Sequence, residues 1–275
     1  TTTAADAQGN ALQVTGDKMT SDVTAAGLEM GIPINLAAGG QLSAFEDKST
    51  GIKVAAGKMT IPVKDTAGNV AMNIVGDVSS VVGTGTQARV TLSNVRLQTR
   101  ETTVDLSRDD PLLTQFSASF DAELKRIPEG ARLTMTVKKE LPADARGGFE
   151  LIARRDGNTI GSVGAAIEVT REGLENGTDL GAVTLRIKVS RAWVLANGGI
   201  QAIKGTRIAE DGTKQMLNAT LVGAANADPM EFAILSPDGF SLFAIVAIVP
   251  VPADFRVSGL IVEPSVAAPK ETVHI

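Results

Sequence analysis

Residues that could carry out covalent chemistry are scarce in this sequence of 275 residues. There is no cysteine, and the single histidine, His274, is next to the last residue. Thiol nucleophiles and thiolate-bound zinc are therefore excluded, and a Ser-His-Asp triad would need the C-terminal tail to fold back into a site. The G-x-S-x-G pattern of a serine nucleophile does not occur either. We expect a protein that is not an enzyme.

Two groups of carboxylates could bind a hard cation through oxygen. They are Asp109-Asp110 and the set formed by Glu172, Glu175 and Asp179. Neither group has the alternating spacing of an EF-hand loop, so both are expected to be solvated turns. We expect no cofactor, and structural calcium is an alternative without support in the spacing.

The segment GTGTQA, Gly83 to Ala88, has the G-x-G-x-x-A spacing of a dinucleotide-binding turn. In that fold the turn follows a strand and opens a helix, whose N-terminus holds the pyrophosphate. Here the residues from Ala88 to Leu92 alternate between apolar and polar, as in a strand. The sequence therefore indicates a loop between strands.

Two tripeptides have the form of a glycosylation acceptor, NGT at Asn176 and NAT at Asn218. An asparagine in this pattern can accept a glycan when an exported chain presents it at its surface. Asn176 and Asn218 are therefore candidate modification sites.

The composition is that of a globular protein, with 43% hydrophobic and 21% charged residues. The net charge is −5, and aromatic residues make up only 3% of the chain. Nucleic acids select for a basic face, and single-stranded ones also need stacking platforms, so we expect no nucleic-acid partner.

Apolar and polar residues alternate with a period of two over many short segments, which indicates half-buried strands. The clearest segments are 133–138 and 183–190. Asp156-Gly157 and Asp211-Gly212 are favoured pairs for hairpin turns. The pattern predicts an all-β protein with two immunoglobulin-like β-sandwich domains in tandem.

The polar segment 106–111 is the best candidate for a domain boundary. We predict an N-terminal domain over residues 1–108, a C-terminal domain over residues 109–262 and a tail over residues 263–275. Residues 110–124 fit either a helix capped by Asp110 or a strand in which Phe116, Phe120 and Leu124 face the core. The strand is favoured.

The segment Phe240–Val249 contains only one polar residue, Ser241. A transmembrane helix needs about 20 apolar residues, so this segment is too short to be one. Its β-branched and aromatic residues predict a strand that is buried on both faces. We expect no transmembrane segment in the given chain.

Two stretches of the second half together resemble the PGF-pre-PGF domain of prokaryotic surface proteins. The first, within residues 181–199, matches a strand of that domain at Leu185, Ile187, Val189, Ser190 and Trp193. The second, within residues 229–248, matches at Pro237, Gly239, Phe240, Ser241, Phe243, Ala244 and Ile245, with Asp238 inserted after the proline. The resemblance covers residues 160–248 and implies an extracellular protein of the cell surface.

The matched residues also have an interpretation that does not depend on the family. Trp193 is expected to end a strand and to cap the core with its ring. Phe240 and Phe243 are three positions apart and are expected to point to opposite faces of one strand. Gly239 allows the turn before that strand. All six motif residues, Pro237 and Ser241 included, are expected to be part of the core.

These observations favour a non-enzymatic structural protein, the subunit of a fibre, pilus or surface layer whose partners are copies of itself. Strand exchange at an open sheet edge would join the subunits, with residues 1–15 as the expected donor. The alternative is a monomeric surface adhesin or carbohydrate-binding module, with cell-envelope glycans as partners. A hydrolase is the third hypothesis.

Overall fold

The computed structural model describes residues 12–15, 22–24, 27–36, 44–46, 48, 51–64, 70–82, 85–107, 110–128, 131–139 and 141–251. Several predicted features lie outside the described residues. These are His274, the tail 263–275, residues 1–11 of the expected donor segment, Gly83 and Asp109.

The elements in chain order are β1 (Leu12–Thr15), β2 (Asp22–Thr24), β3 (Gly27–Leu36), β4 (Ala44–Glu46), β5 (Lys53–Ala55), β6 (Lys58–Lys64), β7 (Val70–Val82), β8 (Gly85–Thr99), β9 (Thr102–Val104), β10 (Phe116–Leu124), β11 (Arg132–Lys138), α1 (Ala143–Arg155), β12 (Asn158–Glu172), β13 (Leu180–Val189), α2 (Arg191–Ala196), a 3₁₀ turn (Ile200–Ala202), β14 (Ile203–Ile208), β15 (Lys214–Val222), β16 (Met230–Ser236) and β17 (Leu242–Pro250). The prediction of an all-β fold is confirmed.

The second half of the chain forms two packed antiparallel sheets, as a β-sandwich requires. Sheet A contains, from edge to edge, β1, β11, β12, β17, β14 and the first part of β15. Sheet B contains the last part of β15, then β16, β13 and β10. Strand β15 passes from one sheet to the other, because residues 214–218 pair with β14 and residues 219–222 pair with β16.

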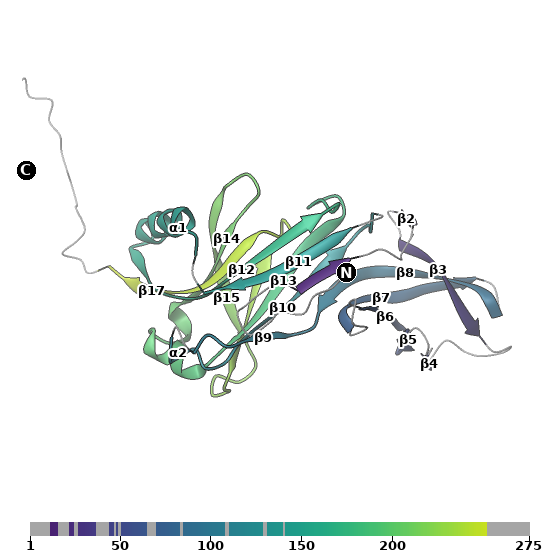
Figure 1. Cartoon of the computed structure of the whole chain (residues 1–275), viewed down its shortest axis with the longest axis horizontal. Coiled ribbons are helices and arrows are strands. Elements are labelled where there is room, and N and C mark those ends of the chain that lie inside the picture. The colour runs from purple at the N-terminus through teal and green to yellow at the C-terminus, as the bar shows by residue number, and fades with distance from the viewer. Residues whose placement is uncertain are drawn as a thin grey trace, which may run out of the picture.

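The first half of the chain extends sheet B. Strand β8 pairs with β7 along one edge, and along its other edge it pairs first with β3 and then with β10. Strands β6, β5 and β4 follow β7 in order. Figure 1 shows the long strands β7 and β8 reaching away from the two-sheet part. The finer division into two domains at residue 108 stays a prediction.

The core lies between the sheets and is built by the alternation seen in the sequence. Leu133, Met135 and Val137 of β11 are buried, whereas Thr134 and Thr136 between them are only partly buried. Residues 116–124 form a strand, as favoured above, with Phe116, Phe120 and Leu124 in the core. The same core continues into the first half through residues of β5 to β8.

Strand β17 is covered on both faces over residues 243–247. Phe243, Ile245 and Ala247 belong to the core between the sheets, whereas Ala244 and Val246 pack in a second cluster with α1. The continuous apolar run therefore reflects two different neighbours on the two faces. Toward the end of the strand this burial is lost, and Val249 is exposed.

Helix α1 covers the outer face of sheet A. Ala145, Phe149 and Ala153 are spaced four apart, so they share one face, and all three are buried against β12 and β17. The turn predicted at Asp156-Gly157 is not a hairpin between strands, because it ends this helix and leads into β12. Among the described residues, no helix combines the length and apolarity that crossing a membrane requires.

Trp193 does not end a strand as predicted. It lies in α2, which follows β13, and its ring is fully buried in the core between the sheets. Ser190 precedes the helix, and its hydroxyl donates a hydrogen bond to the carbonyl of Leu112. The indole therefore reaches the core from a short helix at the end of the sandwich rather than from a sheet.

Candidate functional site

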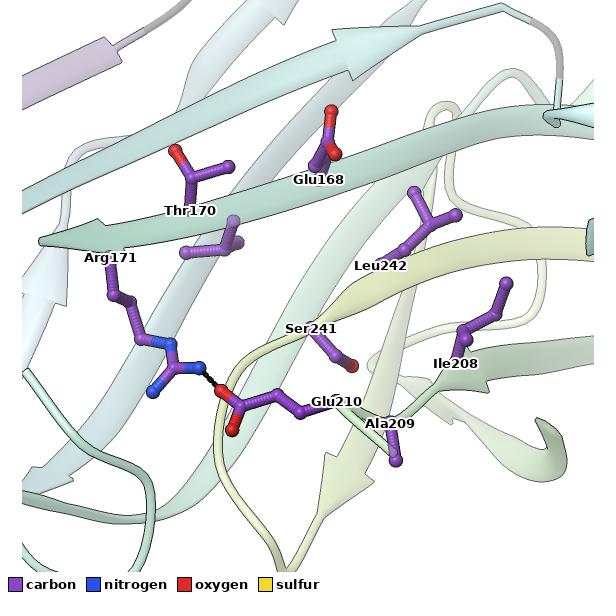
Figure 2. A pocket seen from close by; sticks show the side chains of 9 residues that line it. Glu168, Thr170, Arg171, Ile208, Ala209, Glu210, Ser241 and Leu242 are labelled. Carbon is purple, nitrogen blue, oxygen red and sulfur yellow. Dashed lines mark ion pairs between the residues drawn. The ribbon is translucent and has the colours of Figure 1, made fainter. Parts of the chain in front are cut away.

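A pocket of about 400 Å³ opens where β17 enters sheet A. Three parts of the chain surround it: the end of β12, the turn between β14 and β15, and the start of β17. Figure 2 shows the lining residues, which are Glu168, Val169, Thr170, Arg171, Ile208, Ala209, Glu210, Ser241 and Leu242.

The pocket exists because β12 extends past the first residue of β17. Leu242 is the first residue of β17 and pairs with Glu168 of β12 on one side and with Ile208 of β14 on the other. Strand β12 continues to Glu172, where its partner is β11. The Ser241 carbonyl still accepts a hydrogen bond from the Val169 N–H over 3.2 Å, but the residues before Ser241 leave sheet A, and the pocket lies between the end of β12 and the β14–β15 turn.

Phe240 explains why the chain leaves the sheet. Its ring is fully buried and packs edge to face on Phe120 of β10, with ring centroids 4.5 Å apart. Phe243 is buried in the same core. The expectation that Phe240 and Phe243 point to opposite faces is therefore wrong. Phe240 precedes the strand, and the period-two rule applies only within a strand.

The turn from β16 into Phe240 is held by side-chain contacts. Ser236 is buried, and its hydroxyl donates a hydrogen bond to the carbonyl of Gly239 over 2.8 Å. Gly239 has a φ of 86°, a conformation that L side chains rarely adopt. Pro237 is exposed at the corner of this turn, so the expectation that it belongs to the core is wrong.

Asn176 closes the turn from the opposite side. Its Nδ2 donates to the carbonyl of Phe240 over 2.8 Å, and its Oδ1 accepts from the Phe240 N–H over 2.9 Å. A Cβ on Gly239 would lie 2.0 Å from Oδ1 of Asn176. Gly239 is thus required by its φ and by the close approach of Asn176.

Arg207 of β14 supports the same loop from below the surface. Its side chain is only 2% exposed. Its Nε donates to the hydroxyl of Ser241 over 3.1 Å, and Nη1 donates to a carboxylate oxygen of Asp238 over 3.1 Å and to Gln215 over 3.2 Å. Nη2 donates to the carbonyl of Asp238. A buried charge with this many partners fixes the position of residues 238–241.

Arg171 of β12 is the second nearly buried arginine and lines the pocket. Its side chain is 11% exposed, and it forms an ion pair with Glu210 across the opening (Figure 2). Nη1 donates to the carbonyl of Leu174 over 3.2 Å. Burial lowers the pKa of Arg171 below its ordinary value. An arginine titrates so far above neutral pH that the group remains a cation.

The chemistry available in the pocket is therefore that of a cation beside an apolar wall. Ile208 and Leu242 form the apolar part, and Arg171 supplies donors with a fixed fork geometry. Glu168 also lines the pocket, but its charge is balanced by Lys138 on the neighbouring strand, whose Nζ lies 2.5 Å from Oε2 of Glu168. An anionic group that enters the pocket would have to compete with Glu210 for Arg171.

The two candidate glycosylation sites differ in their surroundings. Asn218 is exposed on β15, and its Oδ1 accepts a long hydrogen bond of 3.5 Å from Lys204. Asn176 is partly buried, and the nitrogen that would carry a glycan is the one that donates to Phe240. Glycosylation at Asn176 would therefore disrupt the hydrogen bond from its Nδ2 to the Phe240 carbonyl. Glycosylation at both positions stays a prediction.

The two carboxylate groups have structural partners, and the expectation that both are solvated turns is wrong for Asp179. Asp179 is buried and accepts from Arg126 Nε over 2.7 Å and from the Glu175 N–H over 2.9 Å. Asp110 accepts from the Leu112 N–H. In the part of the chain that the structure describes, no group of three or more histidines, aspartates and glutamates is arranged to hold a metal ion.

Comparison with known proteins finds no match, whether to a family model, a curated protein or a solved structure. The resemblance of residues 160–248 to the PGF-pre-PGF domain stays a prediction.

Proposed function

We propose that this chain is a non-enzymatic structural protein of a prokaryotic cell surface, in which copies are joined by exchange of strand β1. The observation that carries the proposal is the position of β1. It forms the outer strand of sheet A, next to β11. The resemblance of the second half to a surface-protein domain supports the extracellular location.

The register of β1 on β11 suits exchange between copies. Leu12 stands opposite Met135, and Val14 stands opposite Leu133. The side chains of Met135 and Leu133 are buried. Directly opposite residues share a face of the sheet, so the apolar positions of β1 are in phase with those of β11. Any strand with this alternation, including β1 of another copy, can take the same register.

The energetics of exchange favour a switch that depends on concentration. A β1 strand from a second copy forms the same ladder on β11 as the chain's own strand, so the contacts are balanced. Whether β11 pairs with its own β1 or with β1 of another copy then depends on two quantities. These are the entropy cost of closing the chain on itself and the concentration of other subunits. Because β1 has only four residues, opening it disrupts little of the sandwich.

Engineered disulfides provide a direct test, because the chain has no cysteine of its own. Gln13 and Thr134 are opposite each other in the ladder. Opposite residues have Cα atoms about 4.5–5.5 Å apart, within the roughly 4.4–6.8 Å that a disulfide spans. A mixture of Gln13→Cys and Thr134→Cys proteins should form a covalent dimer on oxidation under assembly conditions. Gln13→Cys mixed with Thr220→Cys, an exposed position on β15, is the control.

The double variant Gln13→Cys/Thr134→Cys tests the same contact within one chain. Oxidised at low concentration, it should lock β1 onto its own β11 and remain monomeric by light scattering, and reduction should restore assembly. Exchange of β1 would be rejected if the mixture of Gln13→Cys and Thr134→Cys proteins assembled into particles but gave no more covalent dimer than the control mixture.

Deletion variants separate β1 from the residues before it. Removal of residues 1–11 retains β1 and should leave assembly intact, whereas removal of residues 1–15 should give a folded monomer. Electron micrographs with filaments of normal length from the shorter protein would reject this end as the donor. If the intact chain is monomeric at every concentration and binds glycans, the alternative function, a surface adhesin, replaces the proposal.

A further inference from the structure

We propose that the pocket at the start of β17 binds a carboxylate group on Arg171, and that Glu210 occupies this position when no ligand is bound. The ligand class is a carboxylate on a short apolar stem. It comes either from a small organic acid or from an acidic side chain of a peptide. This inference does not depend on exchange of β1.

Arg171 has donor capacity that its present partners do not use. Its Nη1 is committed to the carbonyl of Leu174, and Nη2 faces Glu210. Its Nε is buried and has no hydrogen-bond partner among the described residues. An unpaired buried donor is costly. A carboxylate that bonds Nε and Nη2 together would remove this cost with the bidentate geometry that arginine favours.

Glu210 is well placed to give way. Its side chain is 60% exposed, and it lies in the turn between β14 and β15 rather than in a strand. Its other hydrogen bond, from Nδ2 of Asn176, is long at 3.3 Å. An exposed carboxylate on a turn can rotate into solvent at little cost, because water solvates it and such pairs contribute little to stability.

The rest of the pocket defines the stem of the ligand. Ile208, Ala209 and Leu242 line the side away from Arg171, and the volume is about 400 Å³. A stem of two or three carbons would contact these residues while its carboxylate reaches the guanidinium. A longer or branched polar ligand would find no further cation in the lining, since Arg171 is its single basic residue.

The matched variants are Glu210→Gln, which removes the internal carboxylate, and Glu231→Gln as the control. Glu231 also pairs with an arginine, Arg186 at 2.8 Å, but on the outer face of sheet B. Arg171→Lys keeps the charge and removes the fork. Because Glu210 is exposed, its variant is expected to fold, and far-ultraviolet circular dichroism would check this for all three.

The measurement is the NMR signal of the Arg171 Nε–H group, assigned by its loss in Arg171→Lys and followed during titration with sodium propionate. Propionamide at equal ionic strength is the neutral comparison. The Glu210→Gln protein should bind propionate at least about tenfold more tightly than the wild type, and neither should respond to propionamide. A peptide arm uses acetyl-Ala-Asp-Ala-amide against its asparagine analogue.

The outcomes are distinct. Tighter binding of propionate than of the aspartyl peptide identifies a small acid as the ligand source, and the reverse identifies an acidic peptide. Equal affinities of the wild-type, Glu210→Gln and Glu231→Gln proteins for propionate would overturn the proposal. A response to propionamide as large as that to propionate would overturn it as well.

Discussion

The side-chain amide of Asn176 pairs with the main chain of Phe240 as the backbone of a neighbouring strand would. It donates to the carbonyl and accepts from the N–H of the same residue, 64 positions away in the sequence. The Phe240 backbone leaves sheet A at this point, so strand partners cannot satisfy its polar groups there. Asn176 therefore makes it possible for the Phe240 ring to enter the core.

Replacing Asn176 by alanine should lower the free energy of unfolding by about 2–3 kcal/mol, from two lost hydrogen bonds and an unsatisfied N–H. Urea denaturation of both proteins would measure this. Asn218→Ala is the matched control, because Asn218 occupies the same tripeptide pattern but is exposed, and its effect should stay within about 0.5 kcal/mol. Equal effects of the two variants would contradict the role given to Asn176.

Substituting Gly239 by alanine should be more damaging than the same change at Gly212. Both residues have a positive φ, 86° and 81°, so both variants carry backbone strain of about 1–3 kcal/mol. Only at Gly239 would the new Cβ also meet Oδ1 of Asn176, whereas at Gly212 nothing lies within 4 Å. The difference between the two urea midpoints isolates the contact with Asn176, and similar midpoints would argue against it.

Acid should weaken the seam between β9, β10 and β13 through Glu101. Burial raises the pKa of Glu101, but the hydrogen bonds from Lys188 and Ser117 together lower it by more than burial raises it. The pKa therefore lies below its ordinary value of 4.5. The ionised group therefore stabilises the fold above that value, and this stabilisation is lost as the pH falls through the lower, folded-state pKa. Hydrogen bonding to Glu101 raises the pKa of Lys188 above its ordinary value of 10.5. The stability that the charged Lys188 contributes is therefore present below pH 10.5 and is lost as the pH rises through the higher, folded-state pKa.

The variant Glu101→Gln should therefore show a smaller loss of stability between pH 6 and pH 3 than the wild type. The difference should be under about 1 kcal/mol, because the Glu101 side chain is 43% exposed and solvent screens it. Lys188→Met should reduce the acid dependence in the same direction. Urea midpoints at several pH values would measure both effects, and an unchanged profile would show that the pair contributes nothing.

Helix α1 offers a stabilising change at Gly147. This residue is exposed inside the helix, and a Cβ built on it meets nothing within 4 Å. Alanine should raise the free energy of unfolding by about 0.5–1 kcal/mol, or the melting temperature by about 2 °C. Gly148→Ala should gain less, because its Cβ would lie 2.0 Å from Cδ of Lys214. If calorimetry finds that Gly147→Ala lowers the melting temperature, the claim that a Cβ at this position meets no other atom would be contradicted.

The sequence alone predicted the strands that have one buried and one wet face, because their alternation is imposed by the core. Strands β11 and β13 are examples, and β17 was recognisable from its unbroken apolar run. Helix α1 was missed because Gly147 and Gly148 are poor helix formers and Asp156-Gly157 resembled a hairpin turn. The spacing of Ala145, Phe149 and Ala153 was the signal available for it.

The site was harder to predict than the fold. Arg171 lies on β12 and Arg207 lies on β14, and each is largely buried, with side-chain partners distant in sequence. Arg207 contacts Asp238, 31 positions away, through a loop whose course depends on both sheets. No local pattern encodes such a contact. Five of the six motif residues, all except Trp193, lie in or next to this loop, but they do not indicate Arg207, which holds it.

The junction between β8 and β10 has a mechanical consequence. Arg96, Leu97 and Gln98 pair with residues 121–123 in a continuous ladder, and Asp121 also accepts from the side chains of Arg96 and Gln98. A pull along β8 is therefore transmitted from the first half of the molecule to the second as shear on these rungs, which lie in one ladder with β10.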